Sequence, residues 1–253
     1  VFQLGPWITY WSLVMMMTTF ILAHWEGYFI HKLVLRPIAN PTEVQLITIS
    51  TLLITAYQGP FFWLDTVSLP VFGLVQLRYL VLAGSIWGAV STCYDHLTTV
   101  RAHCRNNNQP FRHALLFLMP FFLLVGFSTL WAVTTPEVLY LHTREFLLGT
   151  GFLFSYITIR GIVQAVCKEP YKLYYDVLSP LVIITLMSVI SWAGSTVLLD
   201  AGFVVGVFLF LATIMLARLA VTLISEFCYY LDISPFTISP KLPTAGPLPT
   251  TFT

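Results

Sequence analysis

Hydrophobic positions in this chain run in long uninterrupted stretches and do not alternate with polar ones. Seven stretches approach or exceed the roughly 20 residues that a helix needs to cross the hydrocarbon of a bilayer. They are 5–26, 44–64, 71–94, 114–134, 146–167, 177–198 and 202–226. Strands of a membrane barrel would alternate with period two. The pattern therefore predicts an all-α fold, a multi-pass bundle of about seven transmembrane helices.

The chain is expected to divide after its last apolar stretch, into a helix bundle at 1–231 and a tail at 232–253. The tail is rich in threonine and carries Pro235, Pro240, Pro243, Pro247 and Pro249. Proline removes the backbone donor that a helix needs, and this segment has few apolar side chains to bury. We expect an extended tail that docks on a partner protein.

Composition supports the membrane interpretation and excludes other classes of protein. Of 253 residues, 57% are apolar and only 9% are charged, against roughly 25% charged in a soluble domain. A net charge of +1 offers no basic face for nucleic acid. The four cysteines are widely spaced and show neither a disulfide framework nor a zinc pattern.

Basic residues predict the orientation in the membrane. Numbered from the N-terminus, the odd-numbered loops and the tail share one side, and the even-numbered loops share the other. The first side carries Lys32, Arg36, Arg101, Arg105, Arg112, Lys168, Lys172 and Lys241, whereas the other carries Arg144. Arg78, Arg160 and Arg218 fall within predicted helices. Because basic loops stay inside, we expect the N-terminus outside and the C-terminus inside.

A candidate lipid site lies where the first predicted helix ends and the second begins. Trp25, Glu26 and Tyr28 close the first helix, and Glu43 opens the second. Carboxylates and aromatic faces suit a cationic headgroup such as choline, and Lys32 or Arg36 would reach its phosphate. An ordinary interfacial belt of aromatic and snorkelling polar residues explains the same pattern, so both interpretations stand.

Two further features of the sequence are candidate sites. Arg160 lies mid-helix, where a charge marks either function or a partner inside the bundle, and a lipid phosphate would also satisfy it. His96, His103, Cys104 and His113 gather around the third loop, but their spacing matches no standard metal site. We expect no metal site in this chain.

Three segments resemble the eukaryotic choline/ethanolamine phosphotransferases of the CDP-alcohol phosphotransferase family. Residues 21–28 read ILAHWEGY, similar to the family's Trp-Glu-x-Tyr at a helix end. Residues 40–43 read NPTE, similar to its Gly-Pro-x-Glu, and 233–238 read ISPFTI, similar to its closing Ile-x-x-Phe. The resemblance runs from about 15 to 240 and implies that the seven helices match the family's fourth to tenth.

The resemblance also implies what this sequence lacks. The family's catalytic signature, D-x2-D-G-x2-A-R-x8-G-x3-D-x3-D, holds Mg or Mn, and no aspartate of this chain is followed by glycine. One interpretation is a catalytically silent subunit that binds phospholipid within a larger membrane complex. The alternative is the C-terminal part of an active enzyme that makes phosphatidylcholine or phosphatidylethanolamine from CDP-alcohol and diacylglycerol. A transporter ranks last, because no broken helix pair is evident.

The two interpretations predict different membranes. The family implies the endoplasmic reticulum or Golgi, and a silent complex subunit would fit the mitochondrial inner membrane equally well.

Overall fold

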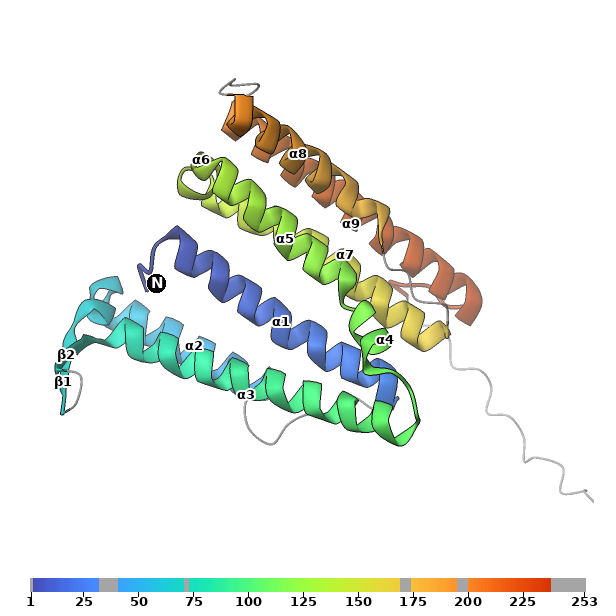
Figure 1. Ribbon diagram of the computed structural model, residues 1–253, viewed down its shortest axis with the longest axis horizontal. Coiled ribbons are helices and arrows are strands. Elements are labelled where there is room, and N and C mark those ends of the chain that lie inside the picture. The colour runs from blue at the N-terminus through green and yellow to red at the C-terminus, as the bar shows by residue number, and fades with distance from the viewer. Residues whose placement is uncertain (1, 32–40, 71–72, 169–173, 195–199, 238–253) are drawn as a thin grey trace, which may run out of the picture.

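Seven long helices run side by side in the computed structural model, which describes residues 2–31, 41–70, 73–168, 174–194 and 200–237. They are α1 (Pro6–Ile30), α2 (Pro41–Gln58), α3 (Leu77–Asn106), α5 (Met119–Thr134), α7 (Thr143–Cys167), α8 (Ser179–Gly194) and α9 (Ala201–Leu231). Figure 1 shows α2 and α3 at one edge, α8 and α9 at the other, and α1 between. The predicted all-α helix bundle is confirmed.

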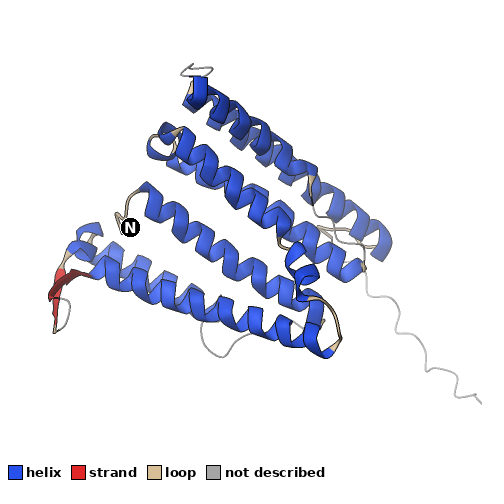
Figure 2. Cartoon of the chain, in the orientation of Figure 1, coloured by secondary structure: helices blue, strands red, loops and turns tan. Residues whose placement is uncertain are grey.

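Short elements join the long helices. They are η1 (Pro60–Leu64), α4 (Phe111–Leu116), α6 (Pro136–Tyr140), η2 (Asp176–Leu178) and the antiparallel strands β1 (Thr66–Leu69) and β2 (Gly73–Gln76). Figure 2 shows this hairpin projecting beyond one end of the bundle. Prolines open α1, η1 and α6, where a missing amide hydrogen bond costs nothing.

The predicted spans need two corrections. Residues 73–76 form β2 and not the start of a helix, and the second helix ends at Gln58 because Gly59 takes a φ of 86° before Pro60. Within the described residues, four helices are long and apolar enough to cross a membrane, namely Pro6–Ile30, Thr143–Cys167, Asp176–Gly194 and Ala201–Leu231, with Met119–Thr134 a shorter apolar one. The chain is an integral membrane protein, and crossings by α2 and α3 stay predictions.

Two clusters of buried apolar side chains form the core, and α1 contributes to both. Tyr10 and Val14 belong to the larger cluster with α5, α7 and α9, whereas Leu22 and Trp25 join a smaller one with α3 and α4. Hydroxyl groups tie helices within the bundle. Tyr10 Oη lies 2.9 Å from Ser128 Oγ, which links α1 to α5. Such bonds stabilise helix pairs where lipid offers no polar partner.

The two ends of the bundle differ in charge. At the end where α1, α3, α7 and α9 finish (Figure 1), which we call the inner end, the described basic residues are Arg101, Arg105, Arg112 and Lys168. Arg144 lies at the opposite, outer end. Arg78 joins it there, because it is the second residue of α3, and its Nη1 donates to the Gln3 carbonyl at 2.7 Å. Arg78 thus lies within a helix as predicted, but in its first turn at the outer end, and the inner end still carries more basic residues.

We expect the inner end to face the cytoplasm or matrix. Cys167, exposed at the end of α7, should react with a membrane-impermeant maleimide only from that side. In a variant whose only cysteine is introduced by Glu137→Cys, on the exposed surface of α6, labelling should occur only from the other side. Labelling of both positions from one side would contradict the orientation.

Residues 238–253 and the basic residues Lys32, Arg36, Lys172 and Lys241 lie outside the described residues. The last helix ends at Leu231, with Asp232 in a left-handed conformation at a φ of 51°. The extended tail and its docking on a partner stay predictions.

Candidate functional site

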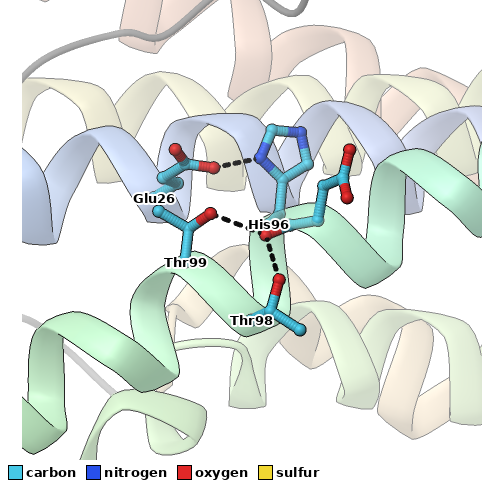
Figure 3. A network of polar contacts seen from close by, with 5 residues as sticks. Glu26, His96, Thr98 and Thr99 are labelled. Atoms are coloured by element: carbon cyan, nitrogen blue, oxygen red, sulfur yellow. Dashed lines mark hydrogen bonds and ion pairs between the residues drawn. The ribbon is translucent and has the colours of Figure 1, made fainter.

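A buried carboxylate and a buried histidine meet near the inner end. Glu26 lies in the last turns of α1, and His96 lies on α3; their side chains are 2% and 4% exposed. Figure 3 shows Glu26 Oε2 against His96 Nδ1, with the Glu26 side chain reaching from α1 toward α3. The contact joins residues 70 positions apart in the chain. It satisfies two polar groups that would be costly to bury separately.

Trp25 fixes the same part of α1 against the next helices. Its indole Nε1 donates to the Ala114 carbonyl of α4 at 2.8 Å, and its ring is 5% exposed. Val100 and Cys104 of α3 and Leu118 complete the cluster around it. Trp25 and Glu26 therefore hold α1, α3 and α4 together, and of the two only Trp25 also lines a pocket.

Two adjoining pockets open beside this contact, between α1, α4 and α7. The first has a volume of about 570 Å³ and a polar wall that includes His31, His103, His113 and Lys168. The second has a volume of about 420 Å³ and a mainly apolar wall that includes Ile21, Leu118, Ile157, Ile162 and Val166.

The two pockets are continuous in their lining. They share Tyr28, His31, Phe117 and Ala165. The Tyr28 ring lies 5.0 Å from that of Phe117, so these two side chains form the common wall. The more polar first pocket therefore adjoins the mainly apolar second one, an arrangement that matches a molecule with a polar head and an apolar chain.

The structure distributes the predicted site residues unevenly. Trp25 and Tyr28 line the pockets, whereas Glu26 turns to His96. Glu43 lies half-buried in the first turn of α2, and neither pocket includes it. Lys32 and Arg36 fall outside the part of the chain described here. The role of these residues in binding a headgroup stays a prediction.

Arg160 lies seven residues before the end of α7 and is half-buried. Its Nε is buried without a hydrogen-bond partner among the described residues. Gln164, one turn further along α7, accepts a hydrogen bond from the Tyr175 hydroxyl at 2.8 Å. Arg160 therefore lies one helical turn from a polar contact of the bundle, and neither of the two pockets includes it.

The metal implied by the family resemblance does not fit the residues present here. Within the described ranges, no three His, Cys, Asp or Glu side chains are grouped so that they could hold a metal ion. His103, Cys104 and His113 all line the first pocket, but they too are not grouped so that they could hold a metal ion. We therefore derive no metal-dependent step from this chain.

Sequence reasoning missed the basic wall of the first pocket. His31, His103, His113 and Lys168 come from four separate segments, and only the packing of α1, α3, α4 and α7 brings them together. The sequence signals were the grouping of His103 and His113 around the third loop and the place of all four residues on the predicted inner side.

The chain is similar to several known proteins, although no family model matches it. It is 30% identical over 189 residues to CDP-alcohol phosphatidyltransferase class-I family protein 2 of Dictyostelium discoideum, a match covering 75% of this chain and 44% of the relative. It is 26% identical to protein 3 of the same family and organism, over 92% of this chain and 65% of the relative.

A plant protein shows the same likeness. Choline/ethanolaminephosphotransferase 1 of Arabidopsis thaliana is 28% identical to this chain over 175 residues, which cover 64% of this chain and 44% of the relative. The matched region thus spans between about two fifths and two thirds of these relatives.

Proposed function

Because the chain is related in sequence to the CDP-alcohol phosphotransferases, we propose that it is a lipid-binding membrane module of that type, acting in phospholipid synthesis as a non-catalytic part of a larger complex. The pair of adjoining pockets carries the proposal. The second pocket offers about 420 Å³ between helices of the bundle, and its apolar wall suits an acyl chain. The relative from Arabidopsis thaliana is named a choline/ethanolaminephosphotransferase, which supports a role in phospholipid synthesis.

The proposed non-catalytic role rests on the absence of the family's metal-binding aspartate signature from this sequence. Transfer between a CDP-alcohol and a lipid hydroxyl develops charge on phosphate, which divalent metal neutralises in this chemistry. The 253-residue sequence contains no Asp-Gly pair and so no copy of the family's signature. The chain's contribution is to hold and orient lipid.

Photocrosslinking tests the lipid site. In bilayer nanodiscs, a diacylglycerol with a diazirine on one acyl chain should label α7 between Ile157 and Val166, the part that lines the second pocket. Gly161→Leu fills that pocket and should reduce this labelling about tenfold, since one excluded apolar chain costs well over 1.4 kcal/mol.

The control is Gly126→Leu, the same substitution at an exposed site on α5 with open space around it. It should leave labelling unchanged. Labelling spread evenly over the exposed faces of α2 and α9, insensitive to Gly161→Leu, would contradict a lipid site in the second pocket.

A second candidate is the lipid-binding part of an active transferase. Its support is that the Arabidopsis relative carries a transferase name and is more than twice as long as the matched region. Co-expression with a segment bearing the family's aspartate signature should then give transfer from CDP-choline or CDP-ethanolamine to diacylglycerol. A silent subunit would give no transfer to diacylglycerol under the same conditions. An enzyme would act in the endoplasmic reticulum or Golgi, and a silent subunit would also fit the mitochondrial inner membrane.

A further inference from the structure

We propose that the first pocket is a binding site for the phosphate group of a phospholipid whose acyl chain occupies the second pocket. The proposal rests on the proposed lipid-binding function and names the headgroup chemistry. The sequence predicted a cationic headgroup beside Glu26 and Glu43. The proposal instead names an anionic group, the phosphate, as the part of the lipid that the first pocket binds.

The polar wall of the first pocket is basic. Its titratable groups other than Tyr28 and Cys104 are the imidazoles of His31, His103 and His113 and the ammonium of Lys168. Each imidazole offers a donor in either charge state, and the lysine adds three donors and a full charge. Among the described lining residues there is no carboxylate. A phosphate oxygen complements this set of donors, whereas a cationic headgroup would face the ammonium of Lys168.

The donors come from separate elements, and the ring of His103 has a hydrogen-bond partner on its own helix. Asn107 Nδ2 lies 3.0 Å from His103 Nε2, which leaves His103 Nδ1 available. His31 and Lys168 follow the last residues of α1 and α7, with φ values of 55° and 56°. Left-handed backbone costs a non-glycine residue about 1 kcal/mol, and here it places both side chains at the mouth of one pocket.

Neutralising the ends of helices is the alternative role for these residues. A cation at a helix C-terminus offsets the partial negative charge of the last carbonyls. That role accounts for His31 and Lys168. It also extends to His103 and His113, which lie in the last turns of α3 and α4, but it does not account for a pocket of about 570 Å³ between the four side chains.

The shared lining of the two pockets favours a phospholipid over a free phosphate. Tyr28, His31, Phe117 and Ala165 line both, so one amphiphile fills the polar and the apolar volume together. A small phosphate ester would leave the apolar pocket empty and would forgo the burial of its chain.

Binding measurements in detergent micelles test the proposal. The ligands are phosphatidic acid, phosphatidylcholine and diacylglycerol with identical acyl chains, and glycerol 3-phosphate. We expect both phospholipids to bind at least tenfold more tightly than diacylglycerol, because a charge-assisted hydrogen bond to phosphate contributes that much. Lys168→Gln combined with His113→Gln should remove the difference.

The matched control is Arg112→Gln. It removes one positive charge beside His113 on α4, but Arg112 is exposed and does not line the pocket. This variant should keep the preference for phosphate. Equal loss in the control would show a general effect of surface charge and would overturn the proposal.

Lys168→Gly separates the side chain from the backbone. Glycine accepts the left-handed conformation without strain, so thermal stability should hold or rise while phospholipid binding falls. A residue that only closes α7 would leave binding unchanged, and that result would overturn the site.

Comparison of the four ligands also shows which proposal is wrong if the expected result is not obtained. If diacylglycerol binds as tightly as both phospholipids, the phosphate site is wrong and the lipid-binding module stands. If no lipid binds and the photocrosslinking also fails, the proposed function is wrong. If glycerol 3-phosphate matches phosphatidic acid, the site takes free phosphate esters, and the phospholipid assignment is overturned.

Discussion

Replacing His96 by alanine should lower the free energy of unfolding by about 3 kcal/mol, because it removes the imidazole from a buried carboxylate. Glu26 is 2% exposed, and its Oε2 contacts His96 Nδ1. The loss should appear in equilibrium unfolding by SDS in mixed micelles. Phospholipid binding in the neighbouring pocket should also weaken, since Trp25 and Tyr28 lie beside Glu26 on α1.

A double variant distinguishes a pair from two independent residues. Replacing both Glu26 and His96 by leucine removes both polar groups, so it should be less destabilising than His96→Ala alone. His113→Ala removes an exposed imidazole and should change the free energy of unfolding by less than about 1 kcal/mol. Additive effects of the single Glu26 and His96 substitutions would show that the contact contributes nothing to stability.

Substituting Gly149 by alanine should destabilise the bundle by about 1–3 kcal/mol through overpacking. Gly149 faces Phe208 where α7 meets α9, and a Cβ there would lie 2.7 Å from Phe208 Cδ1. The phenyl ring cannot retreat easily, because it is 1% exposed and packs edge-on against Trp131 with ring centroids 5.2 Å apart. Thermal unfolding in detergent measures the effect.

Gly151→Ala provides the control on the same helix. A Cβ at Gly151 meets nothing within 4 Å, and alanine has the higher helix propensity by about 1 kcal/mol. This variant should be neutral or slightly more stable. Equal destabilisation by both substitutions would show that the cost comes from the helix backbone and not from contact with Phe208.

The positions of the helices could be predicted from the sequence, because apolar stretches of about 20 residues have few other solutions in a membrane. The prediction was wrong where local backbone geometry decides the structure. Residues 73–76 are apolar enough to extend a helix, yet they pair with 66–69 as strands. Likewise, α3 continues to Asn106 through polar residues that hydropathy alone assigns to a loop.

The candidate site was predictable only in part. Trp25 and Tyr28 lie three positions apart in one recognisable motif, so the sequence identifies them together. The partner of Glu26 lies 70 residues away on another helix, and the four basic residues of the first pocket come from four segments. No periodicity within one helix encodes such contacts, since they depend on how separate helices pack.

The separation between Glu26 and His96 also governs how the protein is assembled during synthesis. A ribosome adding about 5–20 residues per second needs roughly 4–14 s to cover the 70 residues between them. During that interval α1 has entered the membrane without its partner helix. Glu26 lies only four residues before the end of α1, so its carboxylate can stay in water at the bilayer surface. Arrival of α3 would then withdraw the carboxylate from water, so this contact forms only after α3 has been inserted and before the helices that follow it.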